Sequence, residues 1–167
     1  MKRVLVVLTL PPGSCGHCDH YKATQHGKLR DLLRNHRDVD LLHFESAHNE
    51  TGGRGLRLLE GRSDYYHPEM LTTYYDSFPA FYLFSAKDWM DPNRLLNGHV
   101  FGGQVIEKDG MRKVKYPENS AYDPRAEKIY AWYWDLASKD SMGGPSYQIK
   151  TYEQHNTDIR RSMIKRQ

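Results

Sequence analysis

The chain has 167 residues, 38% of them hydrophobic, which suits one domain with an adequate core and argues against full disorder. Its 24 basic and 21 acidic residues give a net charge of +3, too mild to indicate a nucleic-acid-binding protein. The apolar runs are too short to span a bilayer. The 2 cysteines cannot form a scaffold of several disulfides.

The chain opens with a basic end and an apolar run from Val4 to Leu10. Such a start imitates a secretory signal, but two prolines and a glycine follow it instead of a small-residue cleavage site. Continuous β-branched residues favour a central strand covered on both faces. Residues 11–13 are expected to end this strand, and Ser14 is expected to cap a helix that starts near Cys15.

The expected helix carries a stripe of mostly apolar residues at helical spacing. The stripe consists of Cys18, Tyr21, Gln25, Leu29, Leu32, Leu33 and His36. Residues 39–46, VDLLHFES, indicate a second strand. A strand–helix–strand run with short links implies a right-handed crossover and a parallel pair of strands.

Residues 47–77 are polar and irregular, and they indicate an insertion that decorates the sheet. Within it, NETGGRG is a glycine-rich loop, LRLLEGR a candidate helical turn and PEMLTTYYDS a candidate short helix. Residues 78–86, FPAFYLFSA, indicate a third strand. Its proline stands at the strand start, where no ladder hydrogen bond is lost.

A hairpin and a last helix are expected after the third strand. Asp109-Gly110 separates GQVIEK from MRKVKY, which is a hairpin signal. Asp123 is expected to cap the last helix, with Pro124 at its first position. Apolar residues then recur at helical spacing, namely Ile129, Trp132, Tyr133 and Leu136.

Both cysteines stand in one motif, GSCGHCDHYK at residues 13–22. At this spacing a pair is more often catalytic or metal-binding than structural. Zinc needs four ligands, whereas Cys15, Cys18 and His20 would supply three, and the chain has no second Cys-x-x-Cys. An inert pair of buried thiols is the other alternative, although the glycine and histidine between the cysteines argue for exposure.

The expected place of the pair, at the beginning of a helix, favours redox chemistry. The first turn of a helix has unpaired N–H groups and a partial positive charge, which would stabilise a thiolate at Cys15 and make it the attacking nucleophile. Cys18, one turn further on, is placed to attack a mixed disulfide and release the partner. Gly16 lets a substrate backbone approach, and His17, when charged, favours the reduced dithiol.

The order of elements, with Cys-Gly-His-Cys at the first strand-to-helix junction, resembles the thioredoxin superfamily over residues 3–138. The tetrapeptide resembles that of protein disulfide isomerase active domains. The resemblance implies an α/β, thioredoxin-like fold: a central mixed sheet flanked by helices, with the insertion before a cis-proline strand. It also implies that Pro79 is this cis-proline, facing the dithiol, and that Phe78 lines the substrate groove. The expected domain is residues 1–140, and residues 141–167 form a C-terminal extension with a basic end.

The chain departs from the family's pattern around the motif. Ser14 replaces the usual tryptophan, Thr9 replaces a buried acid, and Asp19 replaces a lysine. Without the acid, His20 or water would have to move the proton of Cys18. The carboxylate of Asp19 would oppose thiolate formation, although exposure screens it.

We interpret the chain as a thiol–disulfide oxidoreductase that acts on cysteine-containing protein substrates and leans towards oxidation or isomerisation. The residues assigned are Cys15 and Cys18 as catalytic, Gly16 and His17 for redox tuning, and Phe78 and Pro79 for substrate binding. The exchange needs no cofactor and no metal, but it needs a thiol/disulfide recycling partner. The alternative is a redox-inactive binding or structural protein of a larger assembly, built on the same fold. A cytoplasmic location is favoured, with a secretory or virion-associated one left open.

Overall fold

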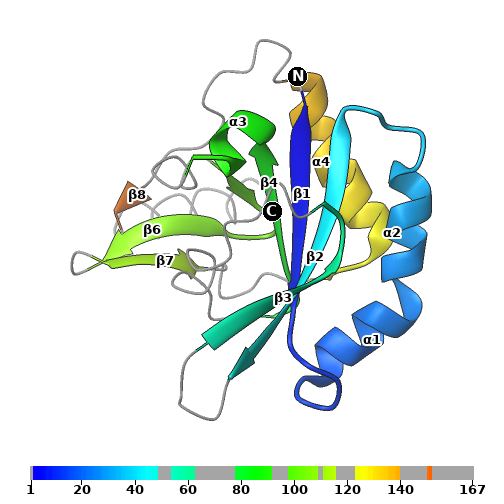
Figure 1. Cartoon of the computed structure of the whole chain (residues 1–167). Coiled ribbons are helices and arrows are strands. Elements are labelled where there is room, and N and C mark those ends of the chain that lie inside the picture. Colours follow the sequence, from blue (N-terminus) through cyan, green and yellow to red (C-terminus); the bar gives the residue numbers. More distant parts are fainter. Residues whose placement is uncertain are drawn as a thin grey trace, which may run out of the picture.

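The computed structural model of the chain describes residues 2–48, 54–62, 78–91, 98–108, 111–115, 123–139 and 150–151. These residues form an α/β structure with a five-stranded sheet, a three-stranded sheet and four helices (Figure 1). The α/β class expected from the sequence is therefore confirmed.

The five-stranded sheet is mixed, with the order β3-β2-β1-β4-β5. Its strands are β1 (Arg3–Thr9), β2 (Val39–His48), β3 (Arg54–Glu60), β4 (Ala80–Ser85) and β5 (His99–Val100). The pair β1 and β2 is parallel, as the crossover between them predicts, and the other neighbours are antiparallel. The predicted parallel pair and the third strand are thus confirmed.

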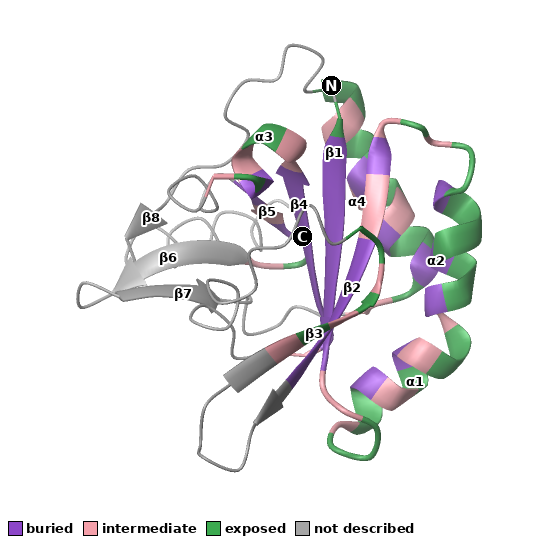
Figure 2. Cartoon of the chain, viewed as in Figure 1, coloured by how far each residue is buried: buried purple, intermediate pink, exposed green. Residues whose placement is uncertain are grey.

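Strand β1 lies at the centre of the sheet, and all 7 of its residues are buried (Figure 2). Val4, Val6 and Leu8 pack on one face of the sheet, while Leu5 and Val7 pack on the other. Full burial of each valine or leucine side chain contributes about 1.5–3 kcal/mol. The apolar run at the start of the chain is therefore a buried central strand, as predicted.

Helices cover both faces of this sheet. The helices α1 (Gly16–Thr24), α2 (His26–Leu33) and α4 (Ala126–Lys139) pack on the face of Leu5 and Val7. The short helix α3 (Ala86–Trp89) packs on the opposite face through Trp89. Figure 1 shows these layers on either side of β1.

The first helical region differs from the single helix that the sequence predicts. It breaks at Gln25, so that α1 and α2 are separate helices, and the N-cap of α1 is Cys15 instead of Ser14. The side-chain oxygen of Gln25 accepts a hydrogen bond from the Ala126 N–H at 3.0 Å, which ties the break to α4. Because the break interrupts the helical periodicity, the predicted stripe is wrong in part: Leu32 is exposed and His26 is buried.

The predicted insertion contains a strand of the main sheet. LRLLEGR was expected to form a helical turn, but its first five residues belong to β3, which pairs antiparallel with β2. Leu56 and Leu58 pack against the core while Arg57 and Leu59 are exposed, the alternation of a strand. A short apolar run does not distinguish a strand from a helical turn. The candidate helix PEMLTTYYDS lies outside the described residues.

The predicted hairpin is confirmed, and it belongs to the second sheet. This sheet has the order β7-β6-β8, with strands β6 (Gln104–Lys108), β7 (Met111–Lys115) and β8 (Lys150–Thr151). Lys108 pairs with Met111, on either side of the Asp109-Gly110 signal. Strand β8 comes from the expected C-terminal extension and pairs in parallel with β6.

The last helix, α4, begins two residues later than predicted. Its first residue is Ala126, whose N–H is bound by Gln25, so Pro124 is not its first position. The carboxylate of Asp123, which was expected to be the cap, instead pairs with Arg125 at 2.7 Å and Lys128 at 3.2 Å. The predicted apolar stripe is confirmed: Ile129 and Tyr133 are buried, and Trp132 and Leu136 pack beside them.

Candidate functional site

A tight turn joins β1 to α1 and directly precedes the cysteine pair. The Ser14 N–H donates to the Pro11 carbonyl at 3.1 Å, and Gly13 has φ = +83°. Proline at the second position and a positive-φ glycine at the third are the residues that a type II turn requires. The sequence Pro11-Pro12-Gly13 therefore ends the strand and turns the chain directly into the helix.

Cys15 occupies the N-cap of α1. Its backbone is extended, with φ −150° and ψ 113°, and its Sγ accepts a hydrogen bond from the Cys18 N–H at 3.4 Å. Its carbonyl accepts the N–H of Asp19 at 3.0 Å, the first bond of the helix. The sulfur thus stands where unpaired N–H groups and the helix dipole stabilise negative charge.

Cys18 is fully buried, one turn into α1. Its Sγ accepts a hydrogen bond from the Leu10 N–H at 3.4 Å. Burial raises the pKa of the Cys18 thiol to about 12, and the neighbouring Cys15 adds to the rise. Cys15 is only partly buried, so the two thiols have the unequal exposure expected of an attacking and a resolving cysteine.

The start of β4 lies against the cysteine pair. The Sγ of Cys15 lies 3.9 Å from the carbonyl oxygen of Phe78, 63 positions along the chain. The peptide bond between Phe78 and Pro79 is cis, as expected from the sequence. The structure therefore brings Cys15 into contact with Phe78. Phe78 is partly buried and stands two positions before the first residue of β4.

Gly16 and His17, the residues between the cysteines, are exposed in the first turn of α1. A Cβ added to Gly16 would meet no atom within 4 Å, so the space above it is open. The surface beside the dithiol is therefore accessible on the side of these two residues.

Asp19, whose carboxylate was expected to oppose thiolate formation, is bound to the turn before α1. Its carboxylate oxygens accept the Gly13 N–H at 3.0 and 3.3 Å, and one of them lies 3.7 Å from Lys22 Nζ. The Asp19 carboxylate thus connects the turn to the helix, and the positive charge of Lys22 offsets the negative charge of this carboxylate. This arrangement weakens the opposition to a Cys15 thiolate that the sequence alone predicts for Asp19.

Thr9, at the position of the missing acid, belongs to a buried polar cluster. Its Oγ1 shares a hydrogen bond of 2.8 Å with His43 Nε2, and the ring of His43 lies 4.6 Å from that of His26 between centroids. His26 Nδ1 shares a 2.7 Å hydrogen bond with the hydroxyl of Tyr21. His26 Nε2 lies 3.4 Å from Glu60 Oε1, but no hydrogen bond joins these two atoms.

Burial keeps the imidazoles of this cluster neutral. Burial and the neighbouring His26 lower the pKa of His43 from 6.5 to about 4, and burial also lowers the pKa of His26. Burial alone would raise the pKa of Glu60, but the paired Arg30 guanidinium holds it below its ordinary value. The cluster therefore carries its negative charge at Glu60, where Arg30 pairs with it.

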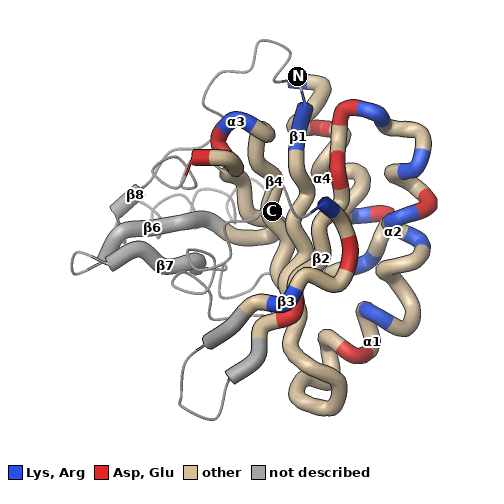
Figure 3. The backbone as a smooth tube through the Cα atoms, viewed as in Figure 1, with Lys and Arg blue, Asp and Glu red and all other residues tan. Residues whose placement is uncertain are grey.

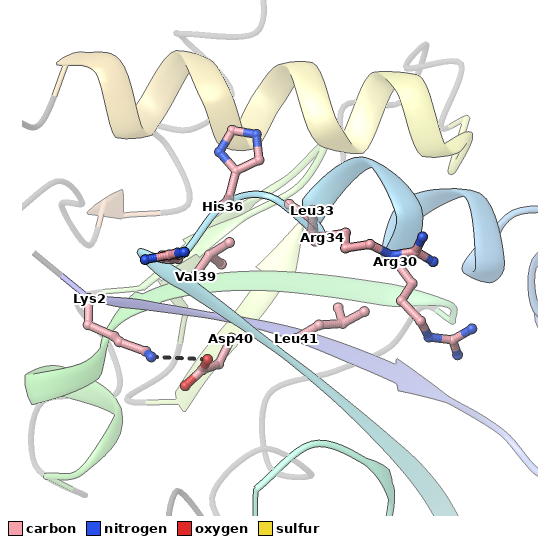
Figure 4. A pocket seen from close by; sticks show the side chains of 9 residues that line it. Lys2, Arg30, Leu33, Arg34, His36, Val39, Asp40 and Leu41 are labelled. Carbon is pink, nitrogen blue, oxygen red and sulfur yellow. Dashed lines mark ion pairs between the residues drawn. The ribbon is translucent and has the colours of Figure 1, made fainter.

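A cavity of about 460 Å³ opens at the far end of β1 from the cysteine pair (Figure 4). Its cationic lining residues are largely partnered within the chain: Lys2 pairs with Asp40 at 3.2 Å, Arg30 with Glu60 and Arg34 with Asp31. No cysteine lines it. None of its lining residues belongs to the turn or to helix α1, which carry the cysteine pair.

The sequence did not single out Lys22, His26 or His43. Lys22 stands four positions after Cys18, a spacing that places two side chains on one helix face, and this signal could have found it. His26 and His43 come together only through the fold of α2 onto β2. In the described residues, no group of three or more His, Cys, Asp and Glu side chains is placed to hold a metal ion.

Searches against protein-family models, curated proteins and solved structures found no match for this chain. Among the residues that the structure describes, no helix is long and apolar enough to cross a membrane. The chain is thus an α/β protein with a mixed sheet and a Cys-x-x-Cys pair at the beginning of a helix.

Proposed function

We propose that this chain is a thiol–disulfide oxidoreductase that exchanges disulfides with cysteine-containing protein substrates. The observation that carries the proposal is the place of Cys15 Sγ at the N-cap of α1, 3.4 Å from the Cys18 N–H. A thiolate there is stabilised by the helix end and remains open to a substrate.

The proposed reaction has two exchange steps. The Cys15 thiolate attacks a substrate disulfide, forms a mixed disulfide and expels one substrate thiolate, which takes a proton from water. The Cys18 thiol then loses its proton and attacks Cys15 Sγ, which releases the second substrate thiolate. The protein ends with a Cys15–Cys18 disulfide and the substrate with two thiols. The reverse sequence oxidises a substrate, and the Cys-Gly-His-Cys tetrapeptide leans towards this direction or towards isomerisation.

We further propose that the fold is thioredoxin-like. The support is the parallel β1–α1–β2 unit with the dithiol at its first junction, followed by the antiparallel strand β4. The contact of Cys15 with the Phe78 carbonyl supports a substrate groove at the head of β4. A substrate backbone would lie between Phe78 and the open space above Gly16.

The test is the refolding of a protein with scrambled disulfides together with the reduction of insulin. The wild-type chain is expected to accelerate at least one of these reactions, while Cys15→Ser abolishes both. Cys18→Ser is expected to accumulate mixed disulfides with the substrate, because nothing resolves them. If the wild type is no faster than the two variants, the proposal is wrong.

A redox-inactive binding or structural protein is the second candidate. It is favoured by the deep burial of Cys18 and the rise of its pKa to about 12, because a thiol that resists ionisation attacks slowly. Trapping with Cys18→Ala distinguishes the two candidates. An oxidoreductase yields substrate complexes that a reducing agent dissolves, whereas a binding protein yields complexes that survive the reducing agent and the loss of Cys15.

A further inference from the structure

Lys22 lies on the same face of α1 as the resolving cysteine. Residues four apart in a helix have neighbouring side chains, and a cation that follows an anion at this spacing is in the favourable order. The chain has no Lys, Arg, Asp or Glu between Leu10 and Cys18, so Asp19 and Lys22 are the first such charges after the dithiol (Figure 3). The side chain of Lys22 is only 21% exposed, which limits the screening of its charge.

The lysine is held by the residue that also binds the cysteine. Lys22 Nζ donates to the Leu10 carbonyl oxygen at 3.1 Å, and the Leu10 N–H donates to Cys18 Sγ at 3.4 Å. A carboxylate oxygen of Asp19 lies 3.7 Å from the same ammonium. The backbone of Leu10 therefore contacts both the ammonium of Lys22 and the buried sulfur of Cys18.

The other ionisable residues next to Cys18 in the chain do not occupy the place of Lys22. The Asp19 carboxylate accepts the Gly13 N–H, and His17 and His20 are exposed to solvent. The Cys15 thiol is consumed in the mixed disulfide during the second step. Among the described contacts, Lys22 is therefore the positive charge available to the developing Cys18 thiolate.

We propose that Lys22 is a positioning residue of the second exchange step: its ammonium stabilises the thiolate of Cys18 as that residue resolves the mixed disulfide. This inference rests on the proposed function. In the step itself, Cys18 gives its proton to solvent, its sulfur bonds to Cys15 Sγ, and the bond from Cys15 to the substrate sulfur breaks. The departing thiolate takes up a proton, so atoms and charge balance.

The experiment uses the reduced full-length chain and an aryl disulfide whose thiolate is coloured. Attack by Cys15 releases the first coloured equivalent, and resolution by Cys18 releases the second, so the two steps are read separately. The rates of both phases are measured across pH for the wild type and for Lys22→Gln, Lys22→Arg and Lys28→Gln. Lys28 is an exposed lysine of α2, so its variant is the matched control for charge.

Lys22→Gln is expected to slow the second phase by roughly three- to tenfold near neutral pH. The pH at which the rate of this phase increases should also move upwards, because the Cys18 thiolate loses a half-buried positive charge. Lys22→Arg is expected to restore the rate, and Lys28→Gln to leave it unchanged. The inference is overturned if the pH profile of Lys22→Gln superimposes on that of the wild type, or if Lys28→Gln shifts it equally. A wild type that never releases the second equivalent would overturn the proposed function itself.

Discussion

At the residue scale, the two thiols differ in exposure although they stand only one helical turn apart. Cys15 caps α1 and is partly exposed, whereas Cys18 is fully buried with a pKa raised to about 12. Because the thiolate is the reactive form, Cys15 should react with external reagents and Cys18 should react only within the molecule.

Alkylation of the native reduced chain tests this difference. With iodoacetamide at neutral pH, Cys15 is expected to be modified at least about tenfold faster than Cys18, since the reagent needs an accessible thiolate. Peptide mass spectrometry after a short exposure measures both rates, and Cys15→Ser and Cys18→Ser confirm the assignment. Equal rates for the two thiols in the folded protein would contradict the account.

At the element scale, the turn before α1 determines where the dithiol lies. The turn depends on Gly13, whose φ of +83° suits glycine, and on the Asp19 carboxylate that accepts the Gly13 N–H. This pair of contacts joins the end of β1 to the first turn of the helix. A side chain at position 13 would therefore strain the approach to Cys15 without any steric clash.

The substitution Gly13→Ala is expected to lower the free energy of unfolding by about 1–2 kcal/mol, the cost of a left-handed backbone for an L-residue. Gly27→Ala is the matched control, because Gly27 is exposed within α2 and a Cβ there meets nothing within 4 Å. Gly27→Ala should raise the free energy of unfolding by about 0.5–1 kcal/mol, because alanine has a higher helix propensity than glycine. Urea denaturation measures both, and a Gly13→Ala variant as stable as Gly27→Ala would disprove the proposed role of the turn.

At the scale of the whole molecule, the buried polar cluster joins five elements. Thr9, Tyr21, His26, His43 and Glu60 come from β1, α1, α2, β2 and β3 respectively. Its imidazoles are neutral in the folded protein because burial lowers their pKa values. Folding is therefore linked to the protonation of these histidines.

Stability is expected to fall as pH drops from 6.5 towards 4. In this pH window the unfolded chain binds a proton at His43 and the folded chain does not. Protonation therefore stabilises the unfolded state relative to the folded state. The shift from 6.5 to about 4 corresponds to roughly 3–4 kcal/mol at full development. Denaturation curves at several pH values measure the loss, which should be smaller in His43→Gln. A variant that loses as much stability as the wild type would show that His43 is not the group responsible.

Strong local patterns allowed much of the fold to be predicted from the sequence. The continuous apolar run of β1, the spacing of α4 and the Asp-Gly signal of the hairpin each belong to one kind of element, and each prediction was confirmed. The cysteine pair at a helix start was predicted because a strand, a Pro-Pro-Gly turn and a helical stretch follow one another directly.

The features that were wrong or missed depend on tertiary contacts. The break at Gln25 and the start of α4 at Ala126 are linked, because the Gln25 side chain accepts a hydrogen bond from the first N–H of α4. Leu56 and Leu58 form a strand because β2 offers them a free edge. The cluster of Thr9, His26 and His43 assembles residues that no sequence spacing connects.

Titration with mixtures of reduced and oxidised glutathione tests the central claim most directly. After acid quenching and alkylation, mass spectrometry counts the free thiols and locates any disulfide. The account predicts reversible formation of a disulfide between Cys15 and Cys18, with a reduction potential less negative than the about −270 mV typical of thioredoxin. A chain that forms only glutathione adducts, or no disulfide at any glutathione ratio, would contradict it.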